Sequence, residues 1–486
     1  MEHKKDKRSF PATFWSANIM ELFERLAWYG MFMILAIYLT GPVEKGGLGF
    51  SQEQKGILMG TVSAILYLLP ILTGSIADKL GYKKVLYGAF ITLIVGYIWM
   101  GHVYSYVGMW FAFLLVAIGA AQFKPIISAT VAKTTNSKNA SLGFGIFYML
   151  INIGGFLGPL IASHLRNTHW SYVFIMSGAA IVVNLFIVTF GFKEPARENK
   201  NVESMRKTLR RIAKDVYTVL LDWRFLVFLL IIIGFWTMYF QMFFSLPVFI
   251  EQWIDTAPLY GLLHSVSPAL AGALGTPEHT INPEIITNMD PFFIIIFQLL
   301  ISAISAKLKP VNSIIYGIVI ATIGSALTFV FKDPLYIIVG ILIFAVGEMA
   351  SSPKITEYIG RIAPKEKTGL YMGMSFLPVA GGNFIGGLVS GFGYQRLSDK
   401  YQLLQYYLDK KGINIPSPTS GHYDTYWQNA CDKLHMTSQQ LNDVLWNTYH
   451  PYNFWIVIAI IGIAAALILF LFNTFVTKGN NVNVKG

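Results

Sequence analysis

Apolar residues in this chain are gathered into runs about as long as a membrane is thick. Windows of roughly twenty apolar residues, the length that crosses about 30 Å of hydrocarbon as a helix, recur along the whole sequence. We therefore predict an all-α membrane protein with twelve transmembrane helices. The predicted spans lie near 16–40, 53–78, 85–102, 106–132, 140–165, 171–192, 224–250, 291–309, 312–331, 334–360, 368–392 and 452–476.

Two polar segments between predicted spans are long for a compact membrane protein, 251–290 and 393–451. The second is rich in Tyr, Asn, Asp and Gln. We predict small extracytoplasmic caps, since long connections without structure are uncommon. Disordered loops are the alternative.

The composition excludes most soluble classes. The chain is 54% hydrophobic and 13% charged, about half the charged share of an average globular protein, and its mean hydropathy is +0.52. The single cysteine, Cys431, excludes an intramolecular disulfide. No Cys/His cluster predicts a metal site, and we expect no organic cofactor. The basic N-terminus and the apolar stretch behind it lack a cleavage site, so we expect no removable signal peptide.

Basic residues predict the orientation in the membrane. An even number of spans places both termini on one side, and most of the 37 Lys and Arg residues fall on that side, which is therefore cytoplasmic. The densest group is Arg206, Lys207, Arg210, Arg211 and Lys214, in a linker at 193–223. We expect a multi-pass protein of the cell (inner) membrane with a cytoplasmic tail at 477–486. The net charge of +11 indicates topology and anionic lipid rather than nucleic acid.

An internal repeat divides the predicted spans into two halves, 1–192 and 224–476. A shift of about 228 residues aligns Gly119-Ala-Ala-Gln-Phe-Lys-Pro125 with Gly347-Glu-Met-Ala-Ser-Ser-Pro353, and Gly154-Gly155 with Gly381-Gly382. Parallel six-helix repeats are typical of transporters that hold substrate near the bilayer midplane. Chance matches between small residues, or glycines that serve close packing alone, are the alternatives.

Charged residues inside spans are the candidate functional groups, because a charge in hydrocarbon costs several kcal/mol and needs a partner. Polar and aromatic residues follow 3/4 spacing on the first span and form one stripe. Lys124 and Glu348 lie in spans four and ten. Protonating one carboxylate in such a group releases a cation, which makes a proton-operated switch; a purely structural ion-pair network is the alternative. The stripe comprises Glu21, Glu24, Arg25, Trp28, Tyr29 and Phe32.

Two further groups lie at the predicted cytoplasmic ends of spans. Asp78, at the end of span two, is followed by a basic turn and is predicted to latch a neighbouring helix end; a plain helix cap is the alternative. Lys354 and Glu357 form an i,i+3 pair in span ten. We expect a gate contact there, or side chains that reach the cytoplasm from the span.

Several motifs resemble those of the proton-dependent oligopeptide transporter family within the major facilitator superfamily. Residues 21–30, ELFERLAWYG, resemble its ExxER(F)xYYG signature, and 147–154, FYMLINIG, its FYxxINxG motif. Residues 74–84 resemble the superfamily's GxxADxxGxxK loop. Lys124-Pro125, Phe235-Trp236 and Gly347-Glu348 match the family's span-four lysine, span-seven FW and span-ten glutamate.

The resemblance implies roles for residues. It assigns proton coupling to Glu21, Glu24, Arg25 and Lys124, peptide contacts to Tyr29, Tyr67, Asn152 and Trp236, and the peptide amine to Glu348. Three positions depart from the family: Phe32 replaces an arginine, Phe240 replaces an acid, and Asp290 replaces the asparagine of an Asn-Pro pair. Asp290 is predicted to replace the lost acid as a proton or ammonium site; capping of span eight is the alternative.

We therefore predict a proton-coupled symporter that imports di- and tripeptides or peptide-like solutes by alternating access. A same-fold transporter of a non-peptide solute, such as an amino-acid derivative, an anion or a drug-like amphiphile, is the alternative, because Phe32 removes one carboxylate-binding cation. An enzyme is not expected, since no catalytic constellation lies in the spans. A receptor or scaffold would not need buried titratable groups.

Overall fold

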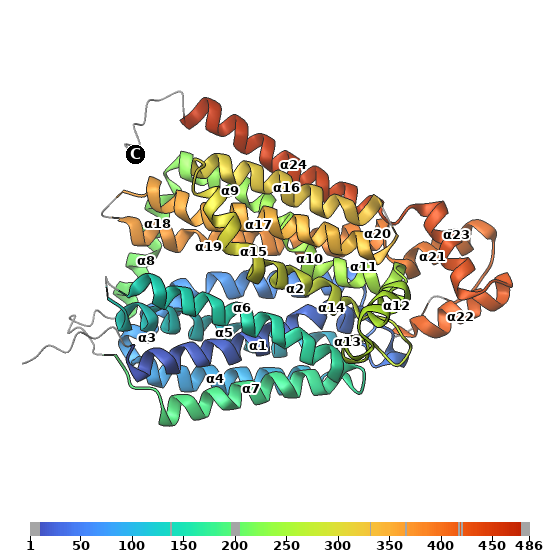
Figure 1. Ribbon diagram of the computed structural model, residues 1–486, viewed down its shortest axis with the longest axis horizontal. Coiled ribbons are helices and arrows are strands. Elements are labelled where there is room, and N and C mark those ends of the chain that lie inside the picture. The colour runs from blue at the N-terminus through green and yellow to red at the C-terminus, as the bar shows by residue number, and fades with distance from the viewer. Residues whose placement is uncertain are drawn as a thin grey trace, which may run out of the picture. The chain divides into compact units, whose positions relative to one another are not determined.

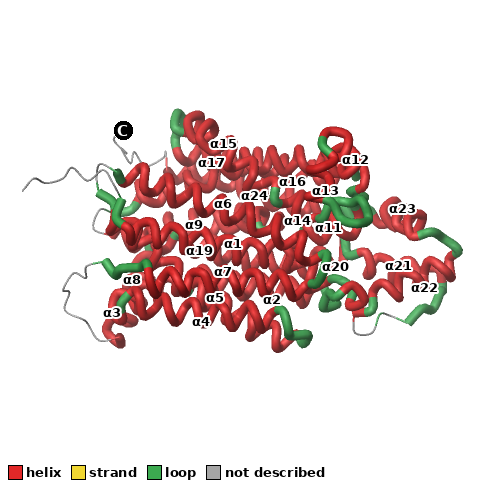
Figure 2. The backbone as a smooth tube through the Cα atoms, turned by 60° about the horizontal axis from the view of Figure 1, so that its bottom comes forward, coloured by secondary structure: helices red, strands yellow, loops and turns green. Residues whose placement is uncertain are grey.

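The computed structural model describes residues 10–136, 139–195, 205–330, 332–364, 367–416, 418 and 421–477. Helices make up nearly all of it, and the β-pairing within the described residues is an isolated bridge between Gly275 and Ile281 (Figure 2). Eleven described helices are long and apolar enough to cross a membrane, or twelve when the bent pair α2 and α3 counts as one span. The predicted all-α, twelve-span class is confirmed.

The spans follow the predicted ranges closely (Figure 1). Spans one to six are α1 (Ala12–Thr40), α2 with α3 (Gln52–Leu68, Pro70–Leu80), α4 (Tyr82–Met100), α5 (Tyr106–Thr134), α6 (Ala140–Arg166) and α7 (Trp170–Phe190). Helix α8 (Met205–Leu220) lies in the predicted linker. Spans seven to twelve are α9 to α11 (Trp223–Tyr239, Gln241–Phe244, Leu246–Trp253), α14 with α15 (Pro283–Thr287, Met289–Ser305), α16 (Pro310–Val330), α17 (Pro334–Ile362), α18 with α19 (Thr368–Met374, Phe376–Leu388) and α24 (Asn453–Phe472).

Prolines account for two breaks in the spans. Helices α2 and α3 meet at a bend of 43°, where Pro70 begins α3. Span seven breaks at Ser245, two residues before Pro247. Proline has no backbone N–H and its ring crowds the preceding turn, so a continuous helix is disfavoured at both places.

The described chain forms two compact units. Unit 1 comprises residues up to Phe32 together with Ile65–Ala213, and unit 2 comprises Met33–Ala64 together with Lys214 onward. The later part of α1 and the first part of α2 therefore belong to unit 2 by their contacts. The halves at 1–192 and 224–476, taken from the repeat, stay a prediction.

Glycine-mediated helix contacts organise both units. In unit 1, α4 packs along α5, and a Cβ on Gly119 would lie 2.9 Å from the carbonyl oxygen of Ala89. In unit 2, α16 packs along α17, and a Cβ on Gly347 would lie 2.3 Å from the backbone nitrogen of Ala321. Gly119 and Gly347 are the glycines that the repeat aligned. Helices α5 and α17 each have 29 residues and an internal proline, Pro125 and Pro353.

Both long connections contain helices, so the disordered alternative is wrong for their described residues. The first holds α12 (Ala257–Val266) and α13 (Pro268–Leu274) before α14. The second continues span eleven as η3 (Val389–Gly393) and α20 (Tyr394–Leu397), and then forms α21 (Lys400–Lys411), α22 (Tyr423–Leu434) and α23 (Ser438–Tyr449). We call α21 to α23 the cap. A capping box between Thr437 and Gln440 begins α23.

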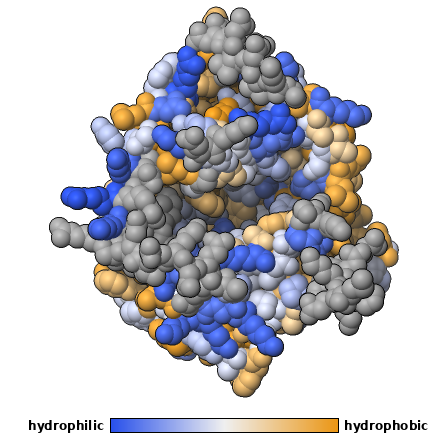
Figure 3. Space-filling model, turned by 90° about the vertical axis from the view of Figure 1, so that its left-hand side faces the viewer, coloured by the Kyte–Doolittle hydropathy of each residue, from blue (hydrophilic) through white to orange (hydrophobic). Residues whose placement is uncertain are grey.

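Figure 3 views the molecule from the left-hand side of Figure 1. The described side chains visible in this view include hydrophilic ones, drawn in blue, and hydrophobic ones, drawn in orange.

Candidate functional site

An ion-pair network on α1 is the centre of the candidate site in unit 1. Glu21, Glu24 and Arg25 are buried, with 2%, 0% and 8% of their surfaces exposed. Arg25 Nε donates to Glu24 Oε2 at 2.6 Å, and the guanidinium also pairs with the same carboxylate through a second nitrogen. Arg25 Nε lies 3.5 Å from Glu21 Oε1, one helical turn away. One guanidinium therefore compensates two carboxylates.

Lys124 brings a second cation to this network from α5. Its Nζ lies 5.1 Å from the centroid of the Tyr67 ring, and it interacts electrostatically with Glu21, Glu24 and Arg25. The adjacent Pro125 has no N–H to offer the carbonyl of Ala121, and that carbonyl instead accepts a hydrogen bond of 2.6 Å from Thr73 Oγ1 of α3. The proline thus ties the lysine-bearing turn of α5 to span two.

Gly154 of the 147–154 motif and the adjacent Gly155 bring α6 against α1. A Cβ on Gly154 would lie 2.4 Å from the carbonyl oxygen of Leu22, and one on Gly155 would lie 3.2 Å from the Tyr29 ring. Tyr29 also lies beneath Arg25, whose Cζ is 5.9 Å from the ring centroid. Asn152 donates to the carbonyl of Tyr148 on its own helix, at 2.8 Å.

Two aromatic residues border the network. Phe32 is 4% exposed and stacks on Trp28 with 5.0 Å between ring centroids, so it packs within an apolar aromatic group. Tyr97 of α4 is fully buried and interacts electrostatically with Glu24 and Arg25. Within the described residues, its hydroxyl and Glu24 Oε1 have no hydrogen-bond partner. Sequence reasoning missed Tyr97 because a tyrosine in a span is more often an interfacial anchor. The unit 1 cluster comprises Glu21, Glu24, Arg25, Tyr29, Tyr67, Tyr97 and Lys124.

A pair of carboxyl groups forms the corresponding site in unit 2. Asp290 of α15 and Glu348 of α17 hydrogen-bond to each other through their side chains, and Glu348 also hydrogen-bonds Tyr239. Asp290 is 5% exposed. An ionised carboxylate only accepts hydrogen bonds, so two carboxyl groups bond each other only when one of them carries a proton.

The capping role of Asp290, one of two expectations for this residue, is wrong. Asn288 precedes α15 and makes no side-chain capping bond, and Asp290 lies inside the first turn. One turn on, Ile294 packs with Ala345 and Met349 of α17. This apolar contact holds α15 against α17 and brings Asp290 to Glu348.

Aromatic side chains of span seven pack against Tyr239, the residue of this span that interacts with Glu348. Trp236 stacks on Phe240 at 5.8 Å, and Tyr239 stacks on Phe344 of α17 at 5.7 Å. A Cβ on Gly382 would lie 2.2 Å from Trp236 Cβ, so span eleven needs glycine there to admit the tryptophan. The unit 2 cluster comprises Trp236, Tyr239, Phe240, Asp290 and Glu348.

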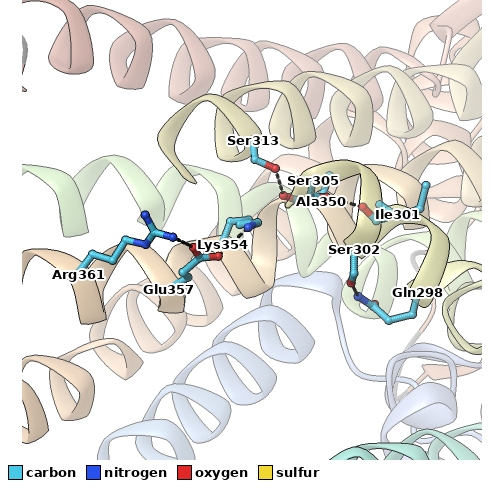
Figure 4. Close-up of polar contacts among 9 residues, drawn as sticks. All are labelled: Gln298, Ile301, Ser302, Ser305, Ser313, Ala350, Lys354, Glu357 and Arg361. Atoms are coloured by element: carbon cyan, nitrogen blue, oxygen red, sulfur yellow. Dashed lines mark hydrogen bonds and ion pairs between the residues drawn. The ribbon is translucent and has the colours of Figure 1, made fainter. Parts of the chain in front are cut away.

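The predicted gate residues make local contacts. Asp78 accepts a hydrogen bond of 3.1 Å from the Tyr82 hydroxyl, which in turn accepts one of 3.0 Å from Lys133 Nζ of α5. Lys354 Nζ lies 2.7 Å from Glu357, whose other oxygen is 2.6 Å from Arg361 (Figure 4). Lys354, Glu357 and Arg361 all belong to α17, so this group forms a ladder along one helix.

Sequence reasoning also missed a polar group beside the cap. Lys55 of α2 has no exposed surface, and its Nζ donates to the carbonyl of Phe244 at 2.8 Å. Nearby, a cavity of about 140 Å³ is lined by polar residues that include Gln52, Asp399 and Gln402. That volume holds a few water molecules and is below the range of ligand pockets, so we do not assign substrate to it.

Comparisons with known proteins agree with this arrangement. The chain is 24% identical over 422 residues to the uncharacterized transporter YclF of Bacillus subtilis, covering 76% of this chain and 86% of that protein. It is 26% identical over 456 residues to dipeptide and tripeptide permease B of Salmonella typhimurium, covering 82% and 90%. The resemblance that the motifs indicate is confirmed by these relatives.

Solved structures share the fold. A peptide transporter POT in complex with sulfate superposes with a TM-score of 0.69 at 16% identity, covering 96% of this chain and 94% of that one. A POT family transporter in complex with 5-aminolevulinic acid gives a TM-score of 0.69 at 17% identity, covering 97% and 98%. A family model described as the Major Facilitator Superfamily matches residues 19–277. This chain, a multi-pass membrane protein, belongs to the Major Facilitator Superfamily.

Proposed function

We propose that this protein is a proton-coupled symporter that imports di- and tripeptides or peptide-like solutes by alternating access. The observation that carries the proposal is the buried network in which Arg25 is bonded to Glu24 and Glu21 while Lys124 interacts with both acids. Protonating one carboxylate releases a cation from its partner, which couples a proton to a rearrangement of charge.

Each cluster, considered by itself, is complementary to one of the charged ends of a short peptide. Its carboxylate matches Lys124, because that lysine reaches the network through electrostatics and a ring contact rather than a close ion pair. Its amine matches the Asp290–Glu348 pair, which has two carboxyl groups and one shared proton. We propose Asp290 as the proton or ammonium site in place of the acid that Phe240 replaces. Tyr29, Tyr67, Asn152, Phe32, Trp236 and Phe240 are the proposed side-chain and backbone contacts.

Orientation and moving parts belong to the same proposal. The basic residues favour cytoplasmic termini in an inner membrane, which places the cap on the extracytoplasmic side. The halves at 1–192 and 224–476 are the proposed moving bodies. Asp78, Lys354 and Glu357 lie near the cytoplasmic ends of their spans and are the proposed inner gate residues.

Phe32 favours one alternative, a non-peptide solute carried by the same fold. An aromatic residue at this position gives apolar surface instead of a bidentate carboxylate clamp. Replacing an arginine by Phe32 would lower the affinity for dicarboxylates and larger peptides, which depend on that clamp. It would not lower the affinity for a small amino-acid derivative.

Uptake into liposomes under an imposed inward proton gradient tests the proposal. Purified protein is reconstituted and offered labelled dipeptides, tripeptides, amino acids and amino-acid derivatives, with and without a protonophore. We expect dipeptides to accumulate only when the gradient is present. Accumulation of a derivative without any peptide would establish the alternative, and uptake that ignores the protonophore would exclude proton coupling.

A further inference from the structure

Lys55 occupies an unusual position for a lysine. It lies on α2, near the cap, with none of its surface exposed, and its Nζ donates to the backbone carbonyl of Phe244 at 2.8 Å. The Tyr394 ring centroid is 5.2 Å from Nζ, and Asp399 attracts the ammonium electrostatically. A neutral carbonyl and a ring offset only part of the hydration that a buried ammonium loses.

The carbonyl that receives Lys55 lies at the break in span seven. Helix α10 ends at Phe244 and α11 begins at Leu246; Ser245 between them stays in the helical region but has a φ of −117°, far from the usual value of about −63°. Ser390 Oγ of span eleven donates to the same carbonyl at 3.2 Å. One carbonyl at the break thus joins spans two, seven and eleven.

Beside Lys55, two glycine pairs bring helix backbones into contact. Gly56 and Gly60 are one turn apart on α2, and Gly387 and Gly391 are one turn apart on span eleven. A Cβ on Gly56 would lie 2.2 Å from the carbonyl oxygen of Gly387, and one on Gly60 would lie 2.8 Å from Gly387 Cα. Such pairs allow close helix association within membranes.

A second polar junction joins spans two and seven to the start of the cap helix α21. Asp399 Oδ1 accepts hydrogen bonds from Gln52 Nε2 of α2 at 3.0 Å and from Gln252 Nε2 of α11 at 2.9 Å. Its other oxygen accepts from the backbone N–H of Gln402 in the cap at 3.1 Å. Both oxygens of the Asp399 carboxylate thus accept hydrogen bonds. Among the described residues, the ammonium of Lys55 forms no ion pair within 4 Å, and its hydrogen bond goes to a neutral carbonyl.

These contacts form a closed gate at the cap end of the molecule. A transporter that works by alternating access must separate span two from spans seven and eleven in one of its states. Tight glycine packing and two polar junctions favour the closed arrangement. Burial of Lys55 opposes it, because opening returns the ammonium to water.

We propose that Lys55 is the release group of this gate: closing buries its ammonium at a cost in free energy, opening recovers that cost, and the gate therefore reopens readily. The inference rests on the alternating access proposed above, but not on the identity of the substrate. Lys55 acts on the equilibrium of the gate and is not a substrate contact.

Accessibility of a thiol in the gate tests the inference. Ser63 is 1% exposed, follows Gly60 at helical spacing on α2, and its hydroxyl has no hydrogen-bond partner among the described residues. The reporter is the full chain carrying Ser63→Cys in a Cys431→Ser background, labelled in proteoliposomes by a membrane-impermeant maleimide from the cap side. In this reporter, Lys55→Met should slow labelling about tenfold, because an apolar side chain of similar length removes the cost of closing.

Two further variants make the result decisive. Lys55→Gln removes the charge but keeps a hydrogen-bond donor for the carbonyl of Phe244. This variant should also slow labelling, and it provides the test in case Lys55→Met does not fold. Lys410→Met removes an exposed lysine of the cap and should leave labelling unchanged. Unchanged or faster labelling in the Lys55 variants, or a reporter that is never labelled, would overturn the inference. The labelling experiment needs no substrate. If labelling is slowed in the Lys55 variants but no peptide is taken up, the inference about Lys55 stands and only the proposed function is refuted.

Discussion

The two clusters differ in how their carboxyl groups are compensated. In unit 1, Glu21 and Glu24 share Arg25, and Lys124 adds a second cation. In unit 2, Asp290 and Glu348 hydrogen-bond each other and Tyr239. Glu21, Glu24 and Asp290 are buried and Glu348 is partly buried. Both clusters lie where α-helices are brought together by glycine or small apolar contacts.

This difference separates two physical tasks. A network of two acids and two bases changes its pairing when one acid takes up a proton, and so it can transmit protonation. Two acids that share a proton have capacity for an incoming cation, which a substrate amine supplies. For the function proposed above, the difference fits a switch in unit 1 and recognition of the amine in unit 2, and a single substitution tests each of these roles.

The largest effect is expected from Glu24→Gln. The amide cannot take up a proton, and it carries no charge to compensate Arg25. Removing one partner of a buried ion pair usually lowers the free energy of unfolding by about 3–5 kcal/mol. Accumulation driven by a pH gradient should disappear, whereas counterflow exchange of substrate persists. Glu278→Gln, at an exposed position, is the matched control. Equal loss of accumulation and exchange would show that Glu24 is structural.

A substitution of Lys124 should have the next largest effect. Hydrogen bonds to charged groups contribute about 1.5–3 kcal/mol, so Lys124→Ala should weaken binding of peptides with a carboxylate about tenfold or more. Peptide amides should be affected much less. Competition assays with matched acid and amide dipeptides measure the ratio. If acids and amides lose affinity alike, Lys124 does not bind the carboxylate.

The acid pair of unit 2 should tolerate a substitution that unit 1 does not. In Asp290→Asn the amide N–H takes the place of the shared proton towards Glu348, so the free energy of unfolding should change by less than about 1 kcal/mol. Proton-driven uptake should nevertheless fall a few-fold. Thermal melting in detergent and uptake in liposomes measure the two quantities. Full coupling in this variant would remove Asp290 from the proton pathway.

The smallest effect lies outside both clusters, at an exposed acid that serves as a reference. Glu44 Oε1 accepts bonds from Thr425 in the cap, from N–H at 3.1 Å and from Oγ1 at 2.8 Å, and lies 3.4 Å from His422 Nδ1. Partial burial alone would raise the pKa of Glu44, but these bonds and His422 hold that pKa below its ordinary value of 4.5. A lowered pKa stabilises docking of the cap above about pH 4.5, and the contribution is lost as the pH falls further.

Because Glu44 is largely exposed, this contribution should stay below about 1 kcal/mol. Hydrogen exchange in α22, corrected for intrinsic rates, should show protection that declines in acid. In Glu44→Gln that decline should be absent. A decline of the same size in both proteins would assign it to another group.

Apolar length and helical spacing explain why much of this structure could be predicted. A span is defined by about twenty apolar residues, so twelve windows gave most of the observed helices to within a few residues. Span eight is the exception, because it begins with α14 at Pro283 and not near 291. The 3/4 spacing of Glu21, Glu24 and Arg25 placed them on one face, as observed. The aligned glycines Gly119 and Gly347 mark equivalent close contacts in the two units.

Contacts between distant segments could not be predicted in this way. Lys55 lies near the start of its apolar window, where a lysine usually reaches the interface, and only the fold shows that Phe244 receives it. The Asp290 side chain had two plausible roles in sequence, and only the structure shows that Asn288 is the N-cap residue of α15 and that Ile294 packs against α17. The position of Pro247 in the sequence is a signal for the break in span seven. Nothing in the sequence indicates that the carbonyl of Phe244 accepts hydrogen bonds at that break.

The contact between Gly56, Gly60 and Gly387 is made by main chain on both sides. A contact made by main chain needs only that its positions stay glycine, so it places no other demand on side chains. Such a contact is compatible with extensive change in sequence elsewhere, and the relatives compared here share only about a quarter of their residues with this chain.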